Sequence, residues 1–315
     1  MMKLAPIVLF VYNRVQHARK TLNAVQKNYL ASESDLFIFS DGPRGDGDQK
    51  AVNNIRNLIK EINGFNSVTI IERNNNLGLA RSIISGVSEI IEKYGRAIVI
   101  EDDIVTSPGF LTFINDALNK YEDKKHIFSI TGINFIKIPE SYKQNTYLFY
   151  RCSSWGWATW EDRWSCVDWT VSDYRDFEAD KEAQKKFNRG GRDLSLMLRD
   201  QMTGEIDSWA IRWAYSHYKN DAYCLYPAVS LVSNIGFDNS GENCIFSFSK
   251  YKTNTEKSCS VDLPEKIHLD ASIVRRFQWY IWKKFSPQLF LEKILGTKGR
   301  HWLKRFFKRN RNFRE

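Results

Sequence analysis

Three consecutive acidic residues, Glu101, Asp102 and Asp103, directly follow the apolar and largely β-branched run 97–100. A run of this composition is typical of a buried strand. Neighbouring carboxylates repel one another, and their burial is costly unless a positive charge compensates them. Carboxylate oxygens suit Mg²⁺ or Mn²⁺, which often shares such ligands with substrate phosphates. The three acids are therefore candidates for a divalent-cation site.

The residues alone leave a second explanation for the acids open. Thr106 or Ser107 can cap a helix that begins at Pro108, and acidic side chains favour the N-terminal end of a helix. No GxGxxG loop follows the first apolar run, and the chain has no GxxxxGK[ST] motif. A bound nucleotide would then be held by a metal ion and side chains rather than by a glycine-rich phosphate loop.

Strand-like and helix-like segments alternate over residues 1–133. This alternation predicts βαβ units and an α/β fold with a mostly parallel sheet and right-handed crossovers. The predicted strands are 7–12, 36–39, 68–71, 98–100 and 127–130, and the predicted helices are 16–29, 49–62, 79–94 and 108–121. Ligands bind outside the carboxyl ends of such strands. We expect the polar residues after each strand to meet at one edge: Asn13-Arg14, Asp41-Gly42, Asn74 to Asn76, and the three acids.

The pattern changes after residue 134, where loops lengthen and aromatic residues concentrate in 150–164. A helix is predicted over 207–219, a short strand over 222–226 and a Gly/Asn-rich loop over 232–243. The predicted organisation is a nucleotide-sugar half (1–133), an acceptor half of the same domain (134–250) and a C-terminal extension (251–315).

The net charge of +9 is unevenly placed. Residues 271–315 hold 13 basic and 2 acidic residues, which leaves 33 basic and 35 acidic residues in the rest. This tail mixes Lys and Arg with apolar and aromatic residues, so it predicts peripheral contact with an anionic membrane surface; a nucleic-acid partner is not expected, because the body is near neutral and carries no nucleic-acid motif. A solvated tail is the alternative.

No run in the sequence is apolar enough to span a bilayer, and the early run 7–12 is too short for the core of a signal peptide. The five cysteines are scattered without metal-ligand spacing. We expect reduced thiols in a cytoplasmic protein, peripheral on the inner face of the cell membrane.

Four ordered motifs carry a family resemblance: PIVLFVYNR, FSDGPR, NNNLGLARSIISGV and AIVIEDDIVTSPGFLTFINDAL. In order and spacing they resemble GT-A-fold glycosyltransferases, and are similar to the Golgi N-acetylglucosaminyltransferase of mannosyl glycoproteins and to bacterial sugar transferases of polysaccharide clusters. The resemblance covers about residues 5–245. It implies a GT-A fold and inverting, metal-dependent transfer from a nucleotide sugar, most simply a UDP-sugar, to a glycan or lipid-linked acceptor in bacterial surface polysaccharide synthesis.

The resemblance also implies roles for residues of the first half. Asp103 matches the Mn²⁺ or Mg²⁺ ligand, Asp102 the ribose contact and Glu101 a supporting acid. Arg14 and Asp41 match contacts to the uracil end of the donor. From the residues alone, a surface arginine and an Asx-turn aspartate are the better explanations of these two positions.

Two polar residues stand near the place where the family has a histidine by the base. These are Asn76 and Arg81. They are the candidates for base recognition in this chain, although they depart from the family's pattern.

On the acceptor side, the resemblance assigns Trp155 and Trp157 to sugar stacking and Gly156 to close backbone approach. The alternative for the tryptophans is core packing, which is the better interpretation for Trp160 and Trp164, four residues apart.

Asp207 matches the catalytic base that deprotonates the acceptor hydroxyl, and Glu205 is the second candidate. Asp207 at a helix start is also a common N-cap. His217 lies on one helical face with Trp209 and Trp213, a pattern more typical of a packed histidine than of a metal ligand.

The segment 234–243 matches the family's glycine-containing loop over the donor, with Asn234 as a phosphate or sugar contact and Gly236 and Gly241 as hinges. An ordinary surface turn is the alternative. Two other functions stay open: a nucleotidyltransferase, and a sugar-binding protein with degenerate motifs.

Overall fold

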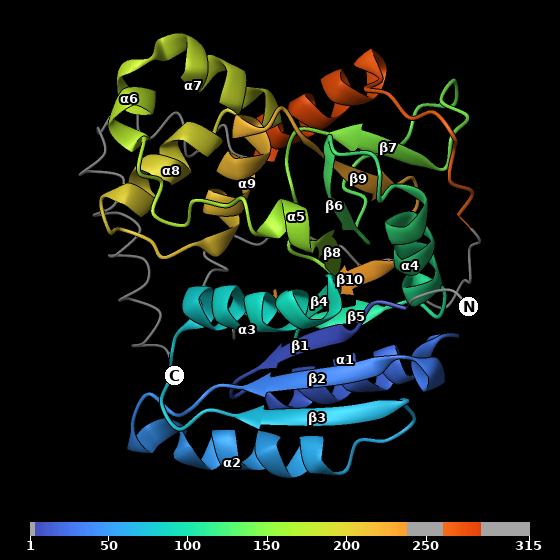
Figure 1. Cartoon of the computed structure of the whole chain (residues 1–315), viewed down its shortest axis with the longest axis vertical. Coiled ribbons are helices and arrows are strands. Elements are labelled where there is room, and N and C mark those ends of the chain that lie inside the picture. The colour runs from blue at the N-terminus through green and yellow to red at the C-terminus, as the bar shows by residue number, and fades with distance from the viewer. Residues whose placement is uncertain (1–3, 238–260, 285–315) are drawn as a thin grey trace.

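An eight-stranded sheet forms the centre of the computed structural model, which describes residues 4–237 and 261–284 (Figure 1). Its strand order is β3-β2-β1-β4-β8-β6-β9-β7. The strands are β1 (Ile7–Val11), β2 (Asp35–Ser40), β3 (Ser67–Glu72), β4 (Arg96–Glu101), β6 (Ile127–Thr131), β7 (Thr146–Phe149), β8 (Trp157–Trp160) and β9 (Tyr223–Pro227). A separate two-stranded sheet pairs β5 (Ile104–Thr106) with β10 (Val232–Asn234).

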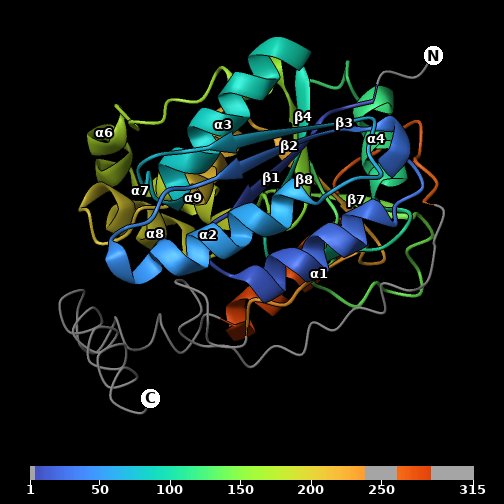
Figure 2. The same ribbon diagram turned by 90° about the horizontal axis from the view of Figure 1, so that it is seen from below.

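The first half of the sheet is parallel, as predicted. Strand β1 pairs in parallel with β2 on one side and β4 on the other, and β2 pairs in parallel with β3. Because the chain steps outward from β1 to β3 and then returns to β4, right-handed crossovers place the first two helices on one face of the sheet and the third on the other. Figure 2 shows this arrangement, with α1 (Val15–Gln26) and α2 (Asp46–Lys60) side by side and α3 (Leu79–Tyr94) opposite them.

The second half of the sheet is mixed. Strand β8 runs antiparallel to both β4 and β6, and β7 runs antiparallel to β9, while β6 and β9 are parallel. Sequence patterns predicted no strand at β7 or β8. Each has only four residues, and every one of them is buried, so neither shows the polar alternation that marks a half-exposed strand.

The remaining helices lie around this sheet and at one end of the molecule. They are α4 (Phe110–Lys120), α5 (Glu161–Trp164), α6 (Tyr174–Ala179), α7 (Lys181–Phe187), α8 (Leu194–Met202) and α9 (Trp209–Lys219), with 3₁₀ turns at Ala31–Glu33 and Asn188–Gly190. The predicted helix over 207–219 begins two residues later than expected. Its N-cap is Ser208, whose hydroxyl accepts a hydrogen bond from the Ile211 N–H, and not Asp207.

The beginning of α4 decides between the two explanations of the acids. The helix starts at Phe110 after Gly109, without a side-chain cap, and strand β5 stands between it and the acids. The Thr106 hydroxyl accepts a hydrogen bond from Asn28 instead of capping α4. The acids therefore lie in the turn from β4 to β5, at the carboxyl end of a buried strand, and do not form the first turn of a helix.

Residues 271–284, shown in orange-red in Figure 1, form a further helix that packs on the second half of the sheet. Ile273, Phe277 and Ile281 are buried, and the Phe277 ring stacks on Phe149 with centroids 3.9 Å apart. This part of the predicted tail thus completes the core, while residues 285–315 lie outside the described residues. Within the described ranges, no helix has the length and apolar content needed to cross a membrane.

Candidate functional site

The acidic cluster (Glu101, Asp102 and Asp103) lies where β4 ends beside β1, which brings Arg14 to it. One terminal nitrogen of the Arg14 guanidinium, Nη2, donates to Asp103 Oδ2 at 2.9 Å and to Asp102 Oδ1. The Asp102 residue is 5% exposed, and its carbonyl oxygen accepts a hydrogen bond of 2.8 Å from the Thr21 hydroxyl. Strand ends from different parts of the sequence therefore meet at one edge, as predicted.

The surroundings of the cluster disfavour the ionised form of its acids. Burial works against the charged Arg14 guanidinium, but Asp102 and Asp103 outweigh it and raise the pKa of Arg14. Burial, reinforced by Asp103 and Asp102, raises the pKa of Glu101 to about 8, and a hydrogen bond from Ser154 opposes this. Burial also raises the pKa of Asp102 to about 6 against the opposing effect of Arg14. Ionisation of all three acids would therefore be short of positive charge, although Arg14 and His17 both oppose the rise in the pKa of Asp102.

This shortage fits a divalent cation. Carboxylate oxygens are the ligands that Mg²⁺ and Mn²⁺ prefer, and a bound dication would supply the missing positive charge. Over the described residues, no group of three or more His, Cys, Asp or Glu side chains is arranged to hold a metal ion. The site therefore suits an ion held by one or two carboxylates and completed by substrate phosphates, rather than an all-protein cage.

An unpaired donor points to an anionic ligand at the same place. Nη1 of Arg14 is buried and has no hydrogen-bond partner within the described part of the chain. A buried unpaired donor costs about 1–3 kcal/mol, and more when the group is charged. A phosphate oxygen of a bound nucleotide would satisfy it.

Residues 234–236 close over the acidic cluster from β10. The Ile235 N–H donates to the Asp103 carbonyl oxygen at 2.9 Å, and the Asn234 amide lies 3.4 Å from Asp103 Oδ1. A Cβ on Gly236 would come within 2.2 Å of Asp103 Oδ2, so only glycine fits without a shift. The structure thus brings Asn234 and Gly236 to the predicted metal ligand, whereas Gly241 lies outside the described residues.

Asp41 and Asn76 brace the neighbouring loops together. The Asp41 carboxylate accepts hydrogen bonds from the main-chain N–H groups of Leu77 and Gly78 at 3.0–3.2 Å. The Asn76 amide donates to the Gly42 carbonyl at 2.8 Å. Both side chains therefore fix the loop after β3 against the loop after β2, and their predicted contacts with the donor stay predictions.

Sequence reasoning missed three polar residues at this edge. Tyr12 and Asp48 share a side-chain hydrogen bond, and the Arg44 guanidinium lies over the Tyr12 ring, 5.6 Å from its centroid. Burial and the Asp48 hydrogen bond raise the pKa of Tyr12 to about 12. Arg44 lies in the loop before α2 and Asp48 in the first turn of α2, within the segment SDGPRGDGD, whose Gly, Pro and Asp content is typical of a loop. The sequence signal for these residues is a single arginine, Arg44, directly after a Gly-Pro turn.

Three other predicted residues have exposed side chains. Arg81 is exposed on α3, and Glu205 is exposed in the loop before α9. The Asp207 side chain is 62% exposed and pairs with Arg212 at 2.9 Å. Within the described ranges, no hydrogen bond or ion pair joins Asp207 to the acidic cluster.

Trp157 and Gly156, the residues with predicted sugar contacts, are both packed within the protein. Trp157 is 0% exposed, and its ring stacks on Trp209 with centroids 5.0 Å apart, inside the hydrophobic core. Gly156 has a positive φ of 58°, and a Cβ there would meet Phe110 and Val232 at 3.0 Å. Both residues serve the protein's own packing, and their predicted sugar contacts stay predictions.

The other aromatic residues of this segment are core residues, as expected. Trp160 and Trp164 are buried, although Trp160 ends β8 and only Trp164 lies in α5. His217 is 0% exposed, with Nδ1 2.9 Å from the Trp213 carbonyl oxygen and Nε2 2.8 Å from the Ser129 hydroxyl. His217 is a packed histidine. Among the described residues, Cys152, Cys166 and Cys224 are free thiols.

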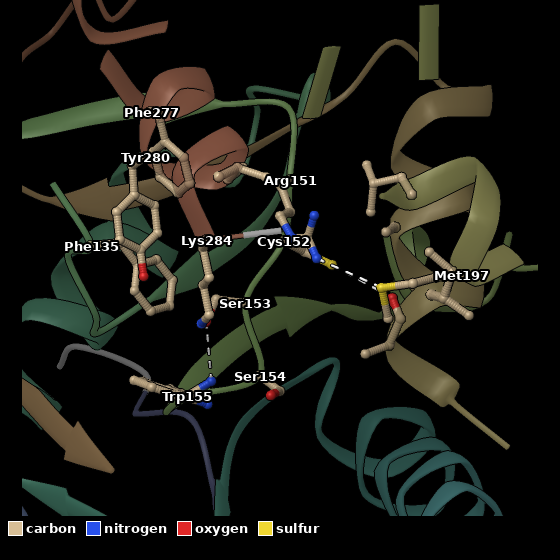
Figure 3. Close-up of a pocket in the computed structure, with 15 residues that line it drawn as sticks. Phe135, Arg151, Cys152, Ser153, Ser154, Trp155, Met197, Phe277, Tyr280 and Lys284 are labelled. Carbon is tan, nitrogen blue, oxygen red and sulfur yellow. Dashed lines mark hydrogen bonds between the residues drawn. The ribbon is translucent and has the colours of Figure 1, made fainter. Parts of the chain in front are cut away.

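The helix over 271–284 lines one side of a pocket of about 210 Å³, with Phe277, Tyr280 and Lys284 (Figure 3). Ser154, which bonds Glu101, is part of its lining. The Phe135 and Tyr280 rings stack in it with centroids 5.8 Å apart, and Trp155 meets Phe135 edge to face at 5.2 Å. The full lining is Phe135, Arg151, Cys152, Ser153, Ser154, Trp155, Leu194, Met197, Ala210, Ile211, Ala214, Phe277, Tyr280, Ile281 and Lys284. Half-buried Trp155 is thus the one predicted aromatic residue placed at a cavity.

The sequence matches no protein-family model and no curated protein. Among solved structures, the chain is similar to the mannosyltransferase PcManGT from Pyrobaculum calidifontis in complex with GDP-Man and Mn²⁺, with 10% identity and a TM-score of 0.34, over 50% of this chain and 44% of that chain. It is also similar to S. aureus TarS, with 14% identity and a TM-score of 0.38, over 72% of this chain and 37% of that chain. The chain spans less than half of either protein.

Proposed function

We propose that this protein is a metal-dependent glycosyltransferase of GT-A fold, which moves a sugar from a nucleotide sugar to a glycan or lipid-linked acceptor. The observation that carries the proposal is the acidic cluster at the carboxyl end of β4, joined by Arg14 from the end of β1. That edge is where α/β sheets bind their ligands. Ionised carboxylates here would need more positive charge, Arg14 Nη1 has no acceptor among the described residues, and a metal–diphosphate ligand would supply both.

In this proposal Asp103 holds Mn²⁺ or Mg²⁺ together with the donor diphosphate, and Asp102 faces the ribose. The ion would neutralise the charge that develops on the leaving diphosphate. Arg14 pairs with both Asp102 and Asp103, and its Nη1, which has no partner among the described residues, would face a phosphate oxygen. Glu101 supports the site through Ser154. Asn234 and Gly236 fix Asp103 from the opposite strand.

The acceptor would enter the pocket beside Ser154 and Trp155. Aromatic faces suit the apolar faces of sugar rings, and this pocket offers Phe135, Trp155 and Tyr280. In inverting transfer, the acceptor oxygen bonds to the anomeric carbon while the bond from that carbon to the diphosphate breaks, and a carboxylate takes the hydroxyl proton. Asp207 is the proposed base, with Glu205 second. Asp207 lies just before the N-cap of α9, and its exposed carboxylate pairs with Arg212.

The donor is proposed to be a UDP-sugar and the role bacterial surface polysaccharide synthesis. The proposed location is the cytoplasm, peripheral on the inner face of the cell membrane, through the basic residues of 271–315. These finer statements follow from the motif resemblance and the tail composition.

Donor binding gives the first test. A panel of nucleotide sugars is titrated calorimetrically with and without Mn²⁺, using the native chain and Asp103→Ala. We expect metal-dependent binding of one nucleotide sugar that Asp103→Ala removes. Asp123→Ala, at an exposed acid after α4, is the matched control and should bind normally. The proposal fails if no nucleotide sugar binds or if Asp103→Ala retains metal-dependent binding.

Product analysis separates the chemistry from nucleotidyl transfer. Incubation of the donor with a glycan mixture should release a nucleoside diphosphate, and release of pyrophosphate from a nucleoside triphosphate would assign the chain to the other class. Asp207→Asn should abolish transfer and leave donor binding intact. If Asp207→Asn stays active and Glu205→Gln does not, the base is Glu205.

A further inference from the structure

The helix over 271–284 exposes two tryptophans on the side that the core does not use. Its inner face holds Ile273, Phe277 and Ile281, which are at most 6% exposed. Trp279 and Trp282, three positions apart, are 58% and 48% exposed. Since the helix already buries an apolar face, its packing does not explain the outward pair.

These tryptophans border a groove of about 740 Å³ between this helix and α7. Figure 1 shows both helices at the same end of the molecule. We name it the basic aromatic groove, and its lining is Lys181, Gln184, Lys185, Asn188, Arg189, Gly191, Arg192, Gln278, Trp279 and Trp282. Four of these ten residues are cationic and none is acidic.

The cations of the groove are weakly compensated. Lys185 lies 3.5 Å from Glu182, but both side chains are about four-fifths exposed, and such pairs contribute little. Arg189 stacks on Tyr150 and lies 4.0 Å from Asp221. Within the described part of the chain, exposed Arg192 makes no hydrogen bond or ion pair. The groove therefore presents positive charge to solvent beside exposed indoles.

A phosphate that sits at the edge of an apolar phase fits this combination. Lys and Arg attract anionic lipid headgroups, and tryptophan prefers the membrane–water interface, where its ring is apolar and its N–H is hydrated. A site for free phosphate would need the cations but not two exposed indoles. The surface is less suited to a nucleic acid. Its cations are confined to one groove, and the chain outside 271–315 is near neutral, with 33 basic and 35 acidic residues.

We propose that the basic aromatic groove binds the phosphates of anionic phospholipid headgroups and seats the protein on a membrane surface. The inference rests on the proposed function, whose membrane partner it names. The helix that carries Trp279 and Trp282 outward also lines the 210 Å³ pocket with Phe277 and Tyr280. A lipid-linked acceptor on the same surface would therefore lie next to the helix that closes the acceptor pocket.

Vesicle co-sedimentation of the full chain tests the charges. Phosphatidylcholine vesicles with and without phosphatidylglycerol are compared for the native protein and for Lys181→Gln/Lys185→Gln/Arg192→Gln. We expect the anionic vesicles to bind the variant more weakly by about tenfold or more, since each cation contributes about fivefold. The control Lys20→Gln/Lys27→Gln/Lys50→Gln changes the net charge equally at exposed sites on and after α1 and in α2, and should change binding by less than about twofold.

The tryptophans have a separate test. Trp279→Ala/Trp282→Ala should lose vesicle affinity and most of the blue shift of tryptophan fluorescence that lipid induces. Tyr29→Ala, at an aromatic residue that is 60% exposed elsewhere, is the control and should behave as the native protein does. Unchanged thermal unfolding of each variant establishes that the fold is intact.

Four outcomes would overturn the inference. The first is equal weakening by the groove and control triple variants, and the second is native-like vesicle binding by Trp279→Ala/Trp282→Ala. The third is binding of inorganic phosphate, and the fourth of a single-stranded oligonucleotide, that the groove variant loses while its vesicle binding stays native. Nucleotide-sugar titrations on the same variants should be unchanged, and the vesicle assay contains no nucleotide. Failure of the proposed transferase activity therefore leaves the membrane result readable, and the reverse also holds.

Discussion

The acidic cluster and the basic aromatic groove differ in how their charged side chains are buried and paired. In the cluster, Asp102 is buried and Arg14 contacts two carboxylates at once. In the groove, the cations lie in solvent and their partners are distant or exposed. The first arrangement ties ionisation to folding, because a buried charge without a partner is costly, while the second leaves charge free to meet an external anion. Four experiments can break or sharpen this comparison, beginning with the largest expected effect.

Removal of Arg14 should be the most costly change. Arg14→Ala leaves Asp102 and Asp103 without a counter-charge, and breaking a buried pair in this way costs about 3–5 kcal/mol. Urea unfolding of the native protein and the variant measures the loss. Because a dication would replace the missing charge, Mn²⁺ should restore part of the stability of Arg14→Ala.

Two comparisons show whether the lost stability comes from the pairing of Arg14 with Asp102 and Asp103. Arg14→Lys keeps the charge and should lose less stability than Arg14→Ala, although it cannot reach both carboxylates as a planar guanidinium does. Lys185→Ala in the groove should change the free energy of unfolding by less than about 0.5 kcal/mol. Equal losses at Arg14 and Lys185 would erase the distinction between the two regions.

His217 extends the comparison to a buried group with no charged partner. Its Nδ1–H donates to the Trp213 carbonyl and its Nε2 accepts from Ser129, so the neutral ring is satisfied, and burial lowers its pKa to about 4. In the unfolded chain the His217 side chain takes up a proton near pH 6.5, whereas in the folded chain it stays neutral down to about pH 4. Stability should therefore fall as the pH drops through this window, by about 3 kcal/mol in total.

Unfolding free energies measured across that window check the His217 prediction. His217→Gln should flatten the pH dependence relative to the native protein, whatever it costs at neutral pH. His268→Gln, at an exposed histidine, should keep the native slope. A ring proton of His217 that titrates near pH 6.5 by NMR would contradict the burial argument.

The first half of the fold could be predicted because its signals are local. The predicted helix over 79–94 matches α3 at both ends, where Gly95 takes the left-handed conformation that ends it. The four parallel strands followed from the alternation of apolar runs and helices. The second half could not be predicted in the same way, because β8 is held by β4 and β6, its neighbours in space rather than in sequence.

The candidate site shows the same limit. The meeting of Arg14 with the acidic cluster follows from strand order, and the resemblance gave the motif that aligned them. Which aromatic residue of 155–157 faces a cavity depends on burial, and the sequence could not show that Trp157 lies inside a core of other tryptophans. The groove joins α7 to a helix about ninety residues later, so no local pattern marked it.

Gly236 tests how closely the acidic cluster is enclosed. Gly236→Ala places a Cβ 2.2 Å from Asp103 Oδ2 and 3.0 Å from Arg14 Nη1, so the segment must shift, at a cost of about 1–3 kcal/mol. Metal-dependent donor binding should weaken with it. Gly47→Ala is the matched control, since nothing lies within 4 Å of a Cβ there and alanine favours the helix by up to about 1 kcal/mol. Native donor binding by Gly236→Ala would show that the segment is free to move away from Asp103.

Substitutions in the basic aromatic groove should have the smallest effect on the free energy of unfolding. A small effect there would separate the groove most clearly from the acidic cluster. Lys181→Gln/Lys185→Gln/Arg192→Gln removes three charges whose partners are exposed or distant, so each should change the unfolding free energy by less than about 0.5 kcal/mol. Since the removed charges repel one another, the triple variant should be at least as stable as the native protein at low salt and lose that advantage as salt screens the repulsion. Urea unfolding at two salt concentrations measures both effects. A large destabilisation would mean that these cations hold the fold together, and a surface needed for folding is not free to meet an external phosphate.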